Sequence, residues 1–275
     1  MKFKTVWAVY FSPVGNTKKI VCHIANGLGN ELNIPVKECR FTLPSDRDGI
    51  YQFGEDDLVV FGTPVYAGRV PNKILPYVQT GFEGNNTALI PVAVFGNRSV
   101  DDGLMELKNE LELKGFKAIA GAAIASRHVF SEKIANGRPD DKDYADMDKF
   151  VHKIVEKLEQ CEELPHQGNF IGRNPVGPYY TPLGIDGQPA KFLKAKPLTD
   201  MDKCTNCGVC VKVCPLGSIS KDNVAEVPGI CIKCQACVHL CPEGAKYFND
   251  EAFLSHVKML EENYTRRAES QFFVD

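Results

Sequence analysis

Short apolar runs alternate with segments of helical periodicity over residues 3–160. The runs are continuous, as expected for strands that are buried on both faces of a sheet. Between them, apolar residues recur every three or four positions, as on one face of an α-helix. The predicted strands are 5–12, 35–42, 57–66, 88–97 and 116–126, and the predicted helices are 15–32, 101–115 and 143–160. This alternation predicts an α/β fold with a doubly wound, five-stranded parallel sheet.

The pattern changes beyond residue 164. Residues 165–198 are rich in proline and glycine, which is typical of a linker. The last segment has helical spacing and ends in an apolar tip, residues 272–274, which we expect to pack back on the fold or to contact a partner. The predicted segments are an α/β domain at 1–164, a linker at 165–198, a small α+β cysteine-rich domain at 199–250, and a C-terminal helix and tail at 251–275.

Bulk composition narrows the function classes. Of the 275 residues, 44% are hydrophobic and 24% are charged, and the formal net charge is -3. This net charge gives no positive electrostatic field that would attract nucleic acid, and no apolar run is long enough to cross a bilayer. The apolar stretch near the start lacks the small-residue cleavage site of a signal peptide, so we expect a cytoplasmic protein. Because the cytoplasm is reducing, clustered cysteines there are metal ligands rather than disulfides.

Eight of the eleven cysteines repeat one spacing, C-x2-C-x2-C-x3-C-P, at residues 204–215 and 231–242. A 4Fe–4S cluster needs four thiolates, and in two-cluster ferredoxins the fourth cysteine of each run ligates the other cluster. The expected ligand sets are Cys204, Cys207, Cys210 and Cys241 for one cluster, and Cys231, Cys234, Cys237 and Cys214 for the other. The region resembles bacterial two-cluster ferredoxins, with every ligand position filled. A pair of zinc sites is the alternative, although zinc ribbons use two pairs of cysteines and have no use for the third one in each run.

A candidate phosphate site follows the first predicted strand. Residues 12–17 read SPVGNT and lead into a helix, whose first N–H groups and dipole favour an anion. Ser12 and Thr17 add hydroxyl donors. Lys18 and Lys19 lie in the first helical turn, where cations are normally disfavoured, and a bound dianion would relieve that conflict. Gly27 and Gly29 do not form a dinucleotide motif, because no strand precedes them, and we interpret them as a helix stop.

Two further loops lie at the carboxyl ends of predicted strands, at residues 62–69 and 95–102. Ligands of open α/β sheets bind at this edge. The three loops together resemble those of flavodoxins over about residues 1–160, with Val14 in place of the middle threonine of the phosphate loop. The resemblance implies the strand order 2-1-3-4-5 and a bound FMN, with Tyr66 covering one face of its ring. The candidate cofactor-binding residues are Ser12, Pro13, Val14, Gly15, Asn16, Thr17, Pro64, Val65, Tyr66, Ala67, Gly68, Phe95, Gly96, Asn97, Arg98 and Asp101.

Three residue positions outside these motifs bear on the chemistry. Relatives often carry an aromatic residue near the position of Val100, so a valine there leaves one face of the flavin open to a substrate or to the cysteine-rich domain. His128 follows a strand end near the presumed flavin and is a possible cofactor or substrate contact. The three remaining cysteines, Cys22, Cys39 and Cys161, are interpreted as small buried hydrophobes.

The whole chain resembles the flavodoxin–ferredoxin fusion proteins of anaerobic bacteria and archaea. This resemblance implies an electron-transfer protein that passes electrons between two 4Fe–4S clusters, FMN and redox partner proteins such as a low-potential ferredoxin or an oxidoreductase. One alternative is an FMN-dependent reductase of a small molecule that the clusters supply with electrons. Another is a zinc-ribbon module joined to an unrelated α/β domain. Because no dinucleotide fingerprint is present, we expect electrons to reach the flavin through the clusters and not from a nicotinamide.

Overall fold

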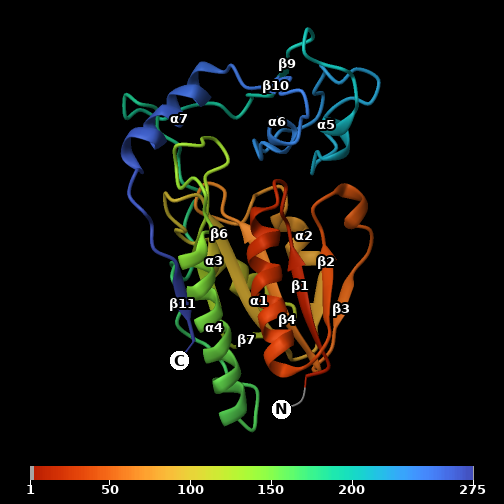
Figure 1. Cartoon of the computed structure of the whole chain (residues 1–275), viewed down its shortest axis with the longest axis vertical. Coiled ribbons are helices and arrows are strands. Elements are labelled where there is room, and N and C mark those ends of the chain that lie inside the picture. Colours follow the sequence, from red (N-terminus) through yellow and green to blue (C-terminus); the bar gives the residue numbers. More distant parts are fainter. Residues whose placement is uncertain (1–2, 275) are drawn as a thin grey trace.

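The computed structural model describes residues 3–274. Residues 1, 2 and 275, which belong to the first and last predicted segments, lie outside it. A central sheet has helices on both faces, and the cysteine-rich region lies across one end of the sheet (Figure 1). The C-terminal segment runs back from that region along the edge of the sheet. Within residues 3–274, no helix combines the length and apolar character needed to cross a membrane.

Five parallel strands make up the body of the sheet, in the order β2-β1-β4-β6-β8. Their bounds are β1 Thr5–Tyr10, β2 Val36–Arg40, β4 Asp57–Pro64, β6 Thr87–Phe95 and β8 Gly121–Ala125. The order 2-1-3-4-5 and the doubly wound fold are therefore confirmed. The strand predicted over 116–126 is divided, because β7 (Phe116–Ala118) also pairs with β6 but stops before β8 begins.

The C-terminal tip adds an edge strand. β11 (Gln271–Phe273) pairs antiparallel with β8, with Phe272 opposite Ala122. The Phe272 ring packs on Phe150, and the Phe273 ring packs on Phe170, so the tip buries apolar surface on both faces of the sheet. The tail thus packs back on the fold and covers an edge that would otherwise expose unpaired backbone groups.

The helices divide the core into two layers. α1 (Asn16–Leu32) and α4 (Asp141–Gln160) cover one face of the sheet, and α2 (Leu75–Thr80) and α3 (Gly103–Glu112) cover the other. The smaller elements are η1 Pro44–Asp46, β3 Tyr51–Phe53, β5 Phe82–Gly84, β9 Leu198–Thr199, α5 Val209–Lys212, α6 Ala236–His239, β10 Lys246–Tyr247 and α7 Glu251–Asn263. β9 pairs with β10, so the linker enters the cysteine-rich region as a strand.

The interpretation of Gly27 and Gly29 as a helix stop is wrong. α1 continues to Leu32 and ends at Asn33, whose φ of 54° is left-handed. A Cβ at Gly29 would lie 2.4 Å from the Cγ2 atom of Val36, and one at Gly27 would lie 3.2 Å from the Val151 methyls. The two glycines therefore allow α1 to pack closely against β2 and α4.

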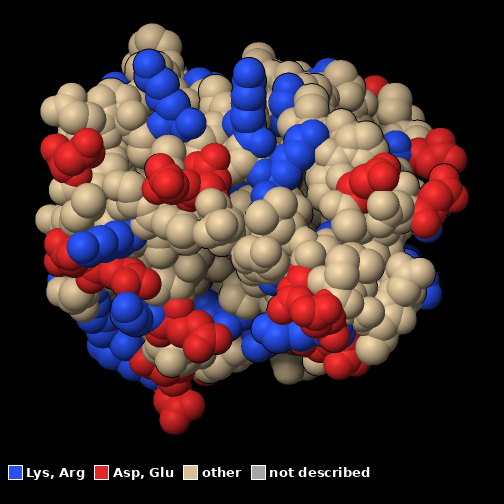
Figure 2. Space-filling model, turned by 90° about the horizontal axis from the view of Figure 1, so that it is seen from above, with Lys and Arg blue, Asp and Glu red and all other residues tan. Residues whose placement is uncertain are grey.

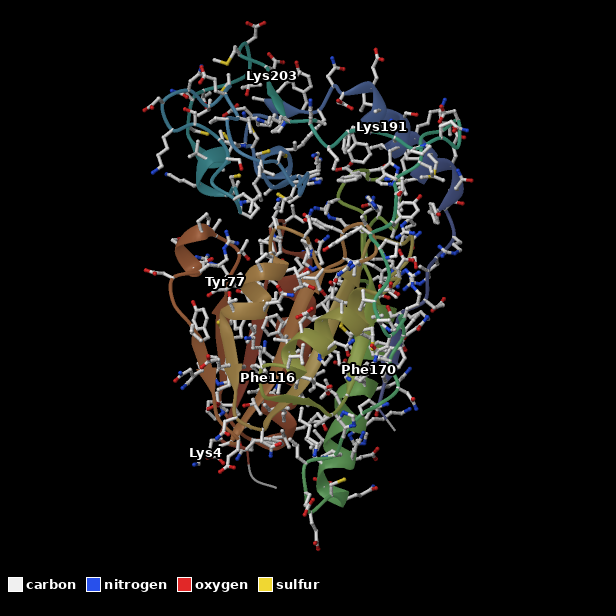
Figure 3. The ribbon with its side chains drawn as sticks, turned by 180° about the vertical axis from the view of Figure 1, so that it is seen from behind. Lys4, Tyr77, Phe116, Phe170, Lys191 and Lys203 are labelled. Carbon is white, nitrogen blue, oxygen red and sulfur yellow. The ribbon has the colours of Figure 1, made fainter. Side chains whose placement is uncertain are left out.

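The linker is ordered along the surface. Phe170 lies beside the sheet and Lys191 lies next to the cysteine-rich region, so the linker spans the height of the α/β domain (Figure 3). The Tyr179 hydroxyl donates to the Val70 carbonyl at 2.9 Å, and the Tyr180 N–H donates to the Ala67 carbonyl at 2.8 Å. The linker thereby crosses the second of the three predicted cofactor loops.

Side-chain donors dock the cysteine-rich region on the rest of the chain. His239 donates through Nε2 to the Val129 carbonyl at 2.8 Å, and Arg47 donates to the Pro215 carbonyl. Lys233 donates through Nζ to the Leu193 carbonyl in the linker. Because the partners outside the region, Arg47, Val129 and Leu193, come from three different segments, the region is held in one orientation over the carboxyl ends of the strands.

Candidate cofactor sites

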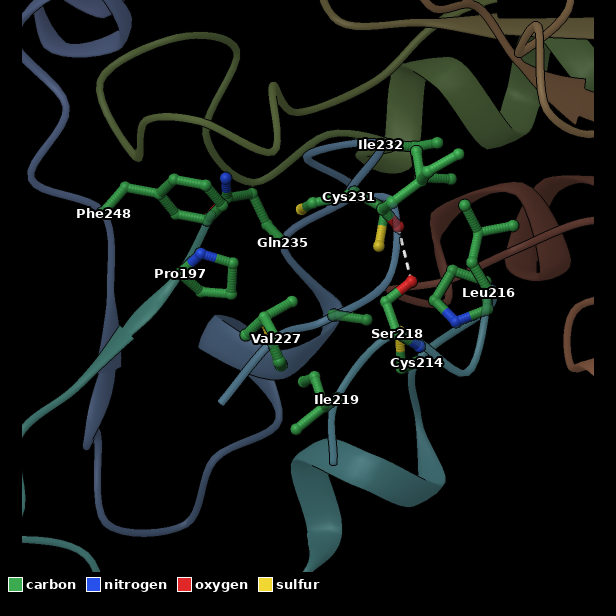
Figure 4. A pocket seen from close by; sticks show the side chains of 15 residues that line it. Pro197, Cys214, Leu216, Ser218, Ile219, Val227, Cys231, Ile232, Gln235 and Phe248 are labelled. Atoms are coloured by element: carbon green, nitrogen blue, oxygen red, sulfur yellow. Dashed lines mark hydrogen bonds between the residues drawn. The ribbon is translucent and has the colours of Figure 1, made fainter. Parts of the chain in front are cut away.

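The eight repeat cysteines line two separate small cavities. Cys204, Cys207, Cys210 and Cys241 line one of them. Cys214, Cys231, Cys234 and Cys237 line the other (Figure 4). Each group combines three cysteines of one repeat with the fourth cysteine of the other, which is the grouping that crossed ligation requires.

Backbone conformation explains how three cysteines of one repeat reach the same cavity. In the first repeat, Asn206 and Gly208 have φ values of 55° and 71°, and in the second, Lys233 and Gln235 have φ values of 56° and 63°. Left-handed residues at these two positions curl the chain into a tight loop. Such a conformation is unfavourable for lysine and glutamine, so the surrounding structure must enforce it.

Hydrogen-bond donors and burial make each cavity suited to thiolate ligands. Backbone N–H groups of Ser218 and Ala245, each four residues after a crossing cysteine, donate to the sulfurs of Cys214 and Cys241 at 3.3 Å. Burial raises the pKa of the Cys237 thiol to about 12. A metal centre must therefore displace protons from buried thiols, and the N–H donors compensate part of that cost.

Each group of four cysteines lines a small cavity. A mononuclear zinc site draws its sulfurs to about 2.3 Å from the metal. Among residues 3–274, no group of three or more His, Cys, Asp or Glu side chains is placed to hold a single metal ion. Four cysteines around a cavity fit a four-iron cluster, whose cube holds its ligands apart.

A cavity of about 390 Å³ lies at the carboxyl ends of the strands. This volume is within the usual range for a small-molecule or cofactor site. All three predicted loops contribute to its wall. The predicted cofactor residues that line it are Ser12, Pro13, Val14, Asn16, Thr17, Pro64, Val65, Tyr66, Ala67, Gly68, Phe95, Gly96 and Arg98.

Hydroxyl groups in the first loop remain available for an anion. The Thr17 side chain is 2% exposed, and its methyl carbon lies 3.1 Å from where a Cβ at Gly62 would stand. Among residues 3–274, the Thr17 hydroxyl has no hydrogen-bond partner, and Thr17 lines the cavity, whereas Thr63 Oγ1, also without a partner there, is sealed from solvent. Ser12 Oγ accepts the Lys18 N–H at 3.0 Å, which leaves the Ser12 hydroxyl proton free to donate.

Two predicted cofactor residues have side chains that are engaged elsewhere in the protein. Asn97 points away from the cavity and holds the C-terminal segment: Nδ2 donates to the carbonyls of Tyr264 and Arg266 at 2.8 and 2.7 Å, and Oδ1 accepts the Ala268 N–H at 3.0 Å. Asp101 also lies outside the lining, where it pairs with the Arg98 guanidinium. The polar residues of the third loop thus organise the loop and the tail.

Two residues at the start of α1 have structural roles of their own. Gly15 does not line the cavity; its φ of 88° turns the chain into α1, a conformation that favours glycine. Lys18 pairs with Glu38 at 2.9 Å and lies over the Tyr10 ring, 5.5 Å from its centroid. A bound dianion is therefore not needed to relieve the charge of Lys18 in the first turn of α1.

Several residues of the cavity wall were missed by sequence reasoning. Val100 is buried in the core, and aromatic rings reach the cavity from elsewhere: Tyr179, Tyr180 and Phe192 from the linker, and Phe130 from the loop after β8. Arg127, in the same loop, also lines the cavity, and its carbonyl accepts from Asn16 Nδ2 at 3.4 Å. The loop after β8 also follows a parallel strand at this edge, so the rule that selected the other three loops could have included it. The linker carried no comparable signal.

The large cavity and one cysteine cavity share a wall. Ile230, Cys231 and Ile232 line both of them. Tyr66 stands on the side of the large cavity, where burial, with a smaller contribution from Cys234 and Cys231, raises its pKa well above 10.0. A cofactor in the large cavity would therefore lie directly against the group formed by Cys214, Cys231, Cys234 and Cys237.

Comparison with known proteins agrees with the cysteine pattern. Residues 197–220 match one family described as a 4Fe-4S binding domain, and residues 228–244 match a second family with that description. No curated protein matches the chain.

Solved structures show a weak likeness in the front half. A flavodoxin of Streptococcus pneumoniae TIGR4 is 16% identical, covers 56% of this chain and 99% of its own, and has a TM-score of 0.40. Flavodoxin 2 of Bacillus cereus is 15% identical over 56% of this chain and 99% of its own, with a TM-score of 0.41. An FMN-bound flavodoxin of Fusobacterium nucleatum is 13% identical over 56% and 99%, with a TM-score of 0.38. It is the strand order of the sheet, rather than this likeness, that assigns the domain to the flavodoxin-like fold. The chain thus joins a flavodoxin-like α/β domain to a ferredoxin-type region that carries two 4Fe–4S binding domains.

Proposed function

We propose that this protein is an iron–sulfur flavoprotein that transfers electrons between two 4Fe–4S clusters, an FMN and redox partner proteins. FMN would occupy the 390 Å³ cavity, with its phosphate at the first loop near Ser12 and Thr17. Each cluster would be held by four cysteines in the crossed grouping. When bound, the clusters supply one-electron chemistry and the flavin supplies one- or two-electron chemistry.

The shared wall is the observation that carries this proposal. Cys231, with its neighbours Ile230 and Ile232, lines both the large cavity and the cysteine cavity beside it, so a single layer of residues separates the two cofactor positions. The other cysteine group lies farther out, and Cys207 is exposed. The outer group has one exposed and one buried cysteine, Cys207 and Cys210, whereas the inner group has two buried cysteines, Cys234 and Cys237, and no exposed one. This order supports electron exchange with a partner at the outer group and with FMN at the inner one.

The surface near the outer group suits a transient partner. On the face drawn in Figure 2, acidic and basic side chains are interspersed, and no single sign dominates. Met201 and Tyr247, which flank the cysteine region, are 59% and 42% exposed. Weak redox encounters use small interfaces of this mixed character. We therefore expect a protein partner, such as a low-potential ferredoxin, with a modest salt dependence of its association.

The test follows the flavin absorbance under anaerobic conditions. Oxidised protein is mixed with reduced low-potential ferredoxin, with NADH or with NADPH. We expect rapid bleaching with reduced ferredoxin and none with either nucleotide, because the chain lacks a dinucleotide fingerprint. Iron analysis of the same preparation should give about eight iron atoms for each FMN.

Two variants make the test specific. Replacement of Cys207 and Cys210 by alanine should leave FMN bound but slow the bleaching by ferredoxin. Cys22→Ala, a half-buried cysteine of α1 outside both groups, is the matched control and should behave as the unaltered protein. Equal rates in the double variant, or fast bleaching by a pyridine nucleotide, would contradict the proposed route.

A further inference from the structure

One end of the large cavity is built by segments other than the three predicted cofactor loops. Its walls come from the loop after β8, from the linker and from α7, and they are mainly apolar. The residues are His128, Val129, Phe130, Pro182, Phe192, Leu193, His256 and Leu260. Phe130 stands between the two histidines: its ring centroid lies 5.0 Å from that of His128 and 6.5 Å from that of His256.

Burial favours the neutral form of both histidines of this end. Burial lowers the pKa of His128 from 6.5 to about 4, and burial also lowers the pKa of His256. Arg98, the nearby cation that acts on both rings, is itself paired with Asp101. A neutral imidazole has one N–H donor and one acceptor nitrogen, so the protein contact of one nitrogen decides the role of the other.

The two rings present opposite hydrogen-bonding groups. His128 Nδ1 accepts the Phe130 N–H at 3.1 Å, so the proton of this ring is on Nε2. His256 Nδ1 lies 2.7 Å from the Leu183 carbonyl, which can only accept, so the proton is on Nδ1 and Nε2 is a bare acceptor. Among residues 3–274, neither Nε2 atom has a hydrogen-bond partner. The fully buried side-chain atoms that lack a partner do not include either of them. Both histidines line the cavity.

We propose that this end of the cavity is a second subsite, which binds an uncharged, planar aromatic molecule carrying one hydrogen-bond acceptor and one donor, such as an aromatic carboxamide. The acceptor would receive the His128 Nε2–H, and the donor would bond to His256 Nε2. The aromatic body would contact Phe130 and Phe192. The inference rests on the proposed function in that FMN is taken to fill the end built by the three loops.

The hydrogen-bonding pattern excludes the charged relatives of such a ligand. A carboxylate can only accept, so it leaves His256 Nε2 without a donor. An ammonium can only donate, so it leaves the His128 N–H without an acceptor. Each charged form also loses its hydration on entering apolar walls. Phe192, which stacks on the His256 ring at 5.3 Å, keeps that ring in place for a neutral ligand.

The test is calorimetric titration of the FMN- and cluster-loaded protein with benzamide, benzoate and benzylamine. Benzamide should bind, and each charged analogue should bind at least about tenfold more weakly. His128→Asn keeps an acceptor for the Phe130 N–H, and His256→Asn keeps a donor to the Leu183 carbonyl. Both variants remove the Nε2 atom. Each should weaken benzamide about three- to tenfold, the usual net effect of one hydrogen bond. His152→Asn, at an exposed position on α4, is the matched control and should change nothing.

The outcomes separate this proposal from the proposed function. Benzamide binding that is weakened to this extent in both cavity variants, with FMN content and bleaching by ferredoxin unchanged, would establish the subsite. Benzamide binding that is absent, or equal in all variants, would overturn it without touching the electron-transfer proposal. Loss of FMN itself from the two cavity variants would also overturn it, because the flavin would then occupy the histidine end.

Discussion

The Thr17 hydroxyl offers a direct test of where the cofactor phosphate binds. Thr17→Val removes the hydroxyl but keeps the methyl group that packs near Gly62. A hydrogen bond to a charged group contributes about 1.5–3 kcal/mol, which corresponds to a loss of FMN affinity of roughly 10- to 150-fold. Riboflavin lacks the phosphate, so its affinity should not change. The assay is the quenching of flavin fluorescence when each flavin is titrated with the FMN-free protein.

Thr63 provides a matched control within the same chain. Its hydroxyl also lacks a partner, but it is sealed from solvent and does not line the cavity. Thr63→Val should leave the affinity for FMN unchanged and raise the free energy of unfolding by about 1–2 kcal/mol, because an unsatisfied buried hydroxyl is removed. The reasoning is refuted if Thr17→Val weakens FMN and riboflavin equally, or if it leaves both unchanged.

Two further predictions address the cysteine groups and the tail. Cys241→Ala should abolish the electron paramagnetic resonance signal of the cluster held mainly by the first repeat. Cys214→Ala should abolish the signal of the cluster held mainly by the second repeat. If each variant instead loses only the cluster of the repeat that carries the substitution, crossed ligation is excluded. Asn97→Ala should lower the free energy of unfolding by about 2–4 kcal/mol, because three hydrogen bonds of 2.7–3.0 Å to the C-terminal segment are lost, as measured by urea denaturation. If FMN affinity fell while stability stayed the same, the Asn97 side chain would belong to the cofactor site after all.

Much of the architecture could be predicted because its signals are local. The continuous apolar runs of β1, β4 and β6 reflect burial on both faces of the sheet. Hardly any other position in a protein requires a short segment to be apolar throughout. The cysteine spacing encodes a ligand set directly, since loop geometry at Asn206 and Gly208 is a property of a few adjacent residues. Loops at the carboxyl ends of strands share one edge by topology alone, so residues such as Ser12 and Tyr66 could be placed together from the sequence.

The tertiary structure decided which other segments complete the cavity. The linker has no periodicity, so its proline- and glycine-rich sequence does not reveal that Tyr179 and Phe192 reach the wall. Asn97 looked like a cofactor contact because its loop is at the right edge, yet its amide turns to the tail 167 to 171 residues farther along the chain. The tautomer of His256 depends on the Leu183 carbonyl, which lies 73 residues away in the chain and is brought near by long-range packing. Burial and hydrogen-bond partners are set by contacts between distant segments, and a local pattern does not contain them.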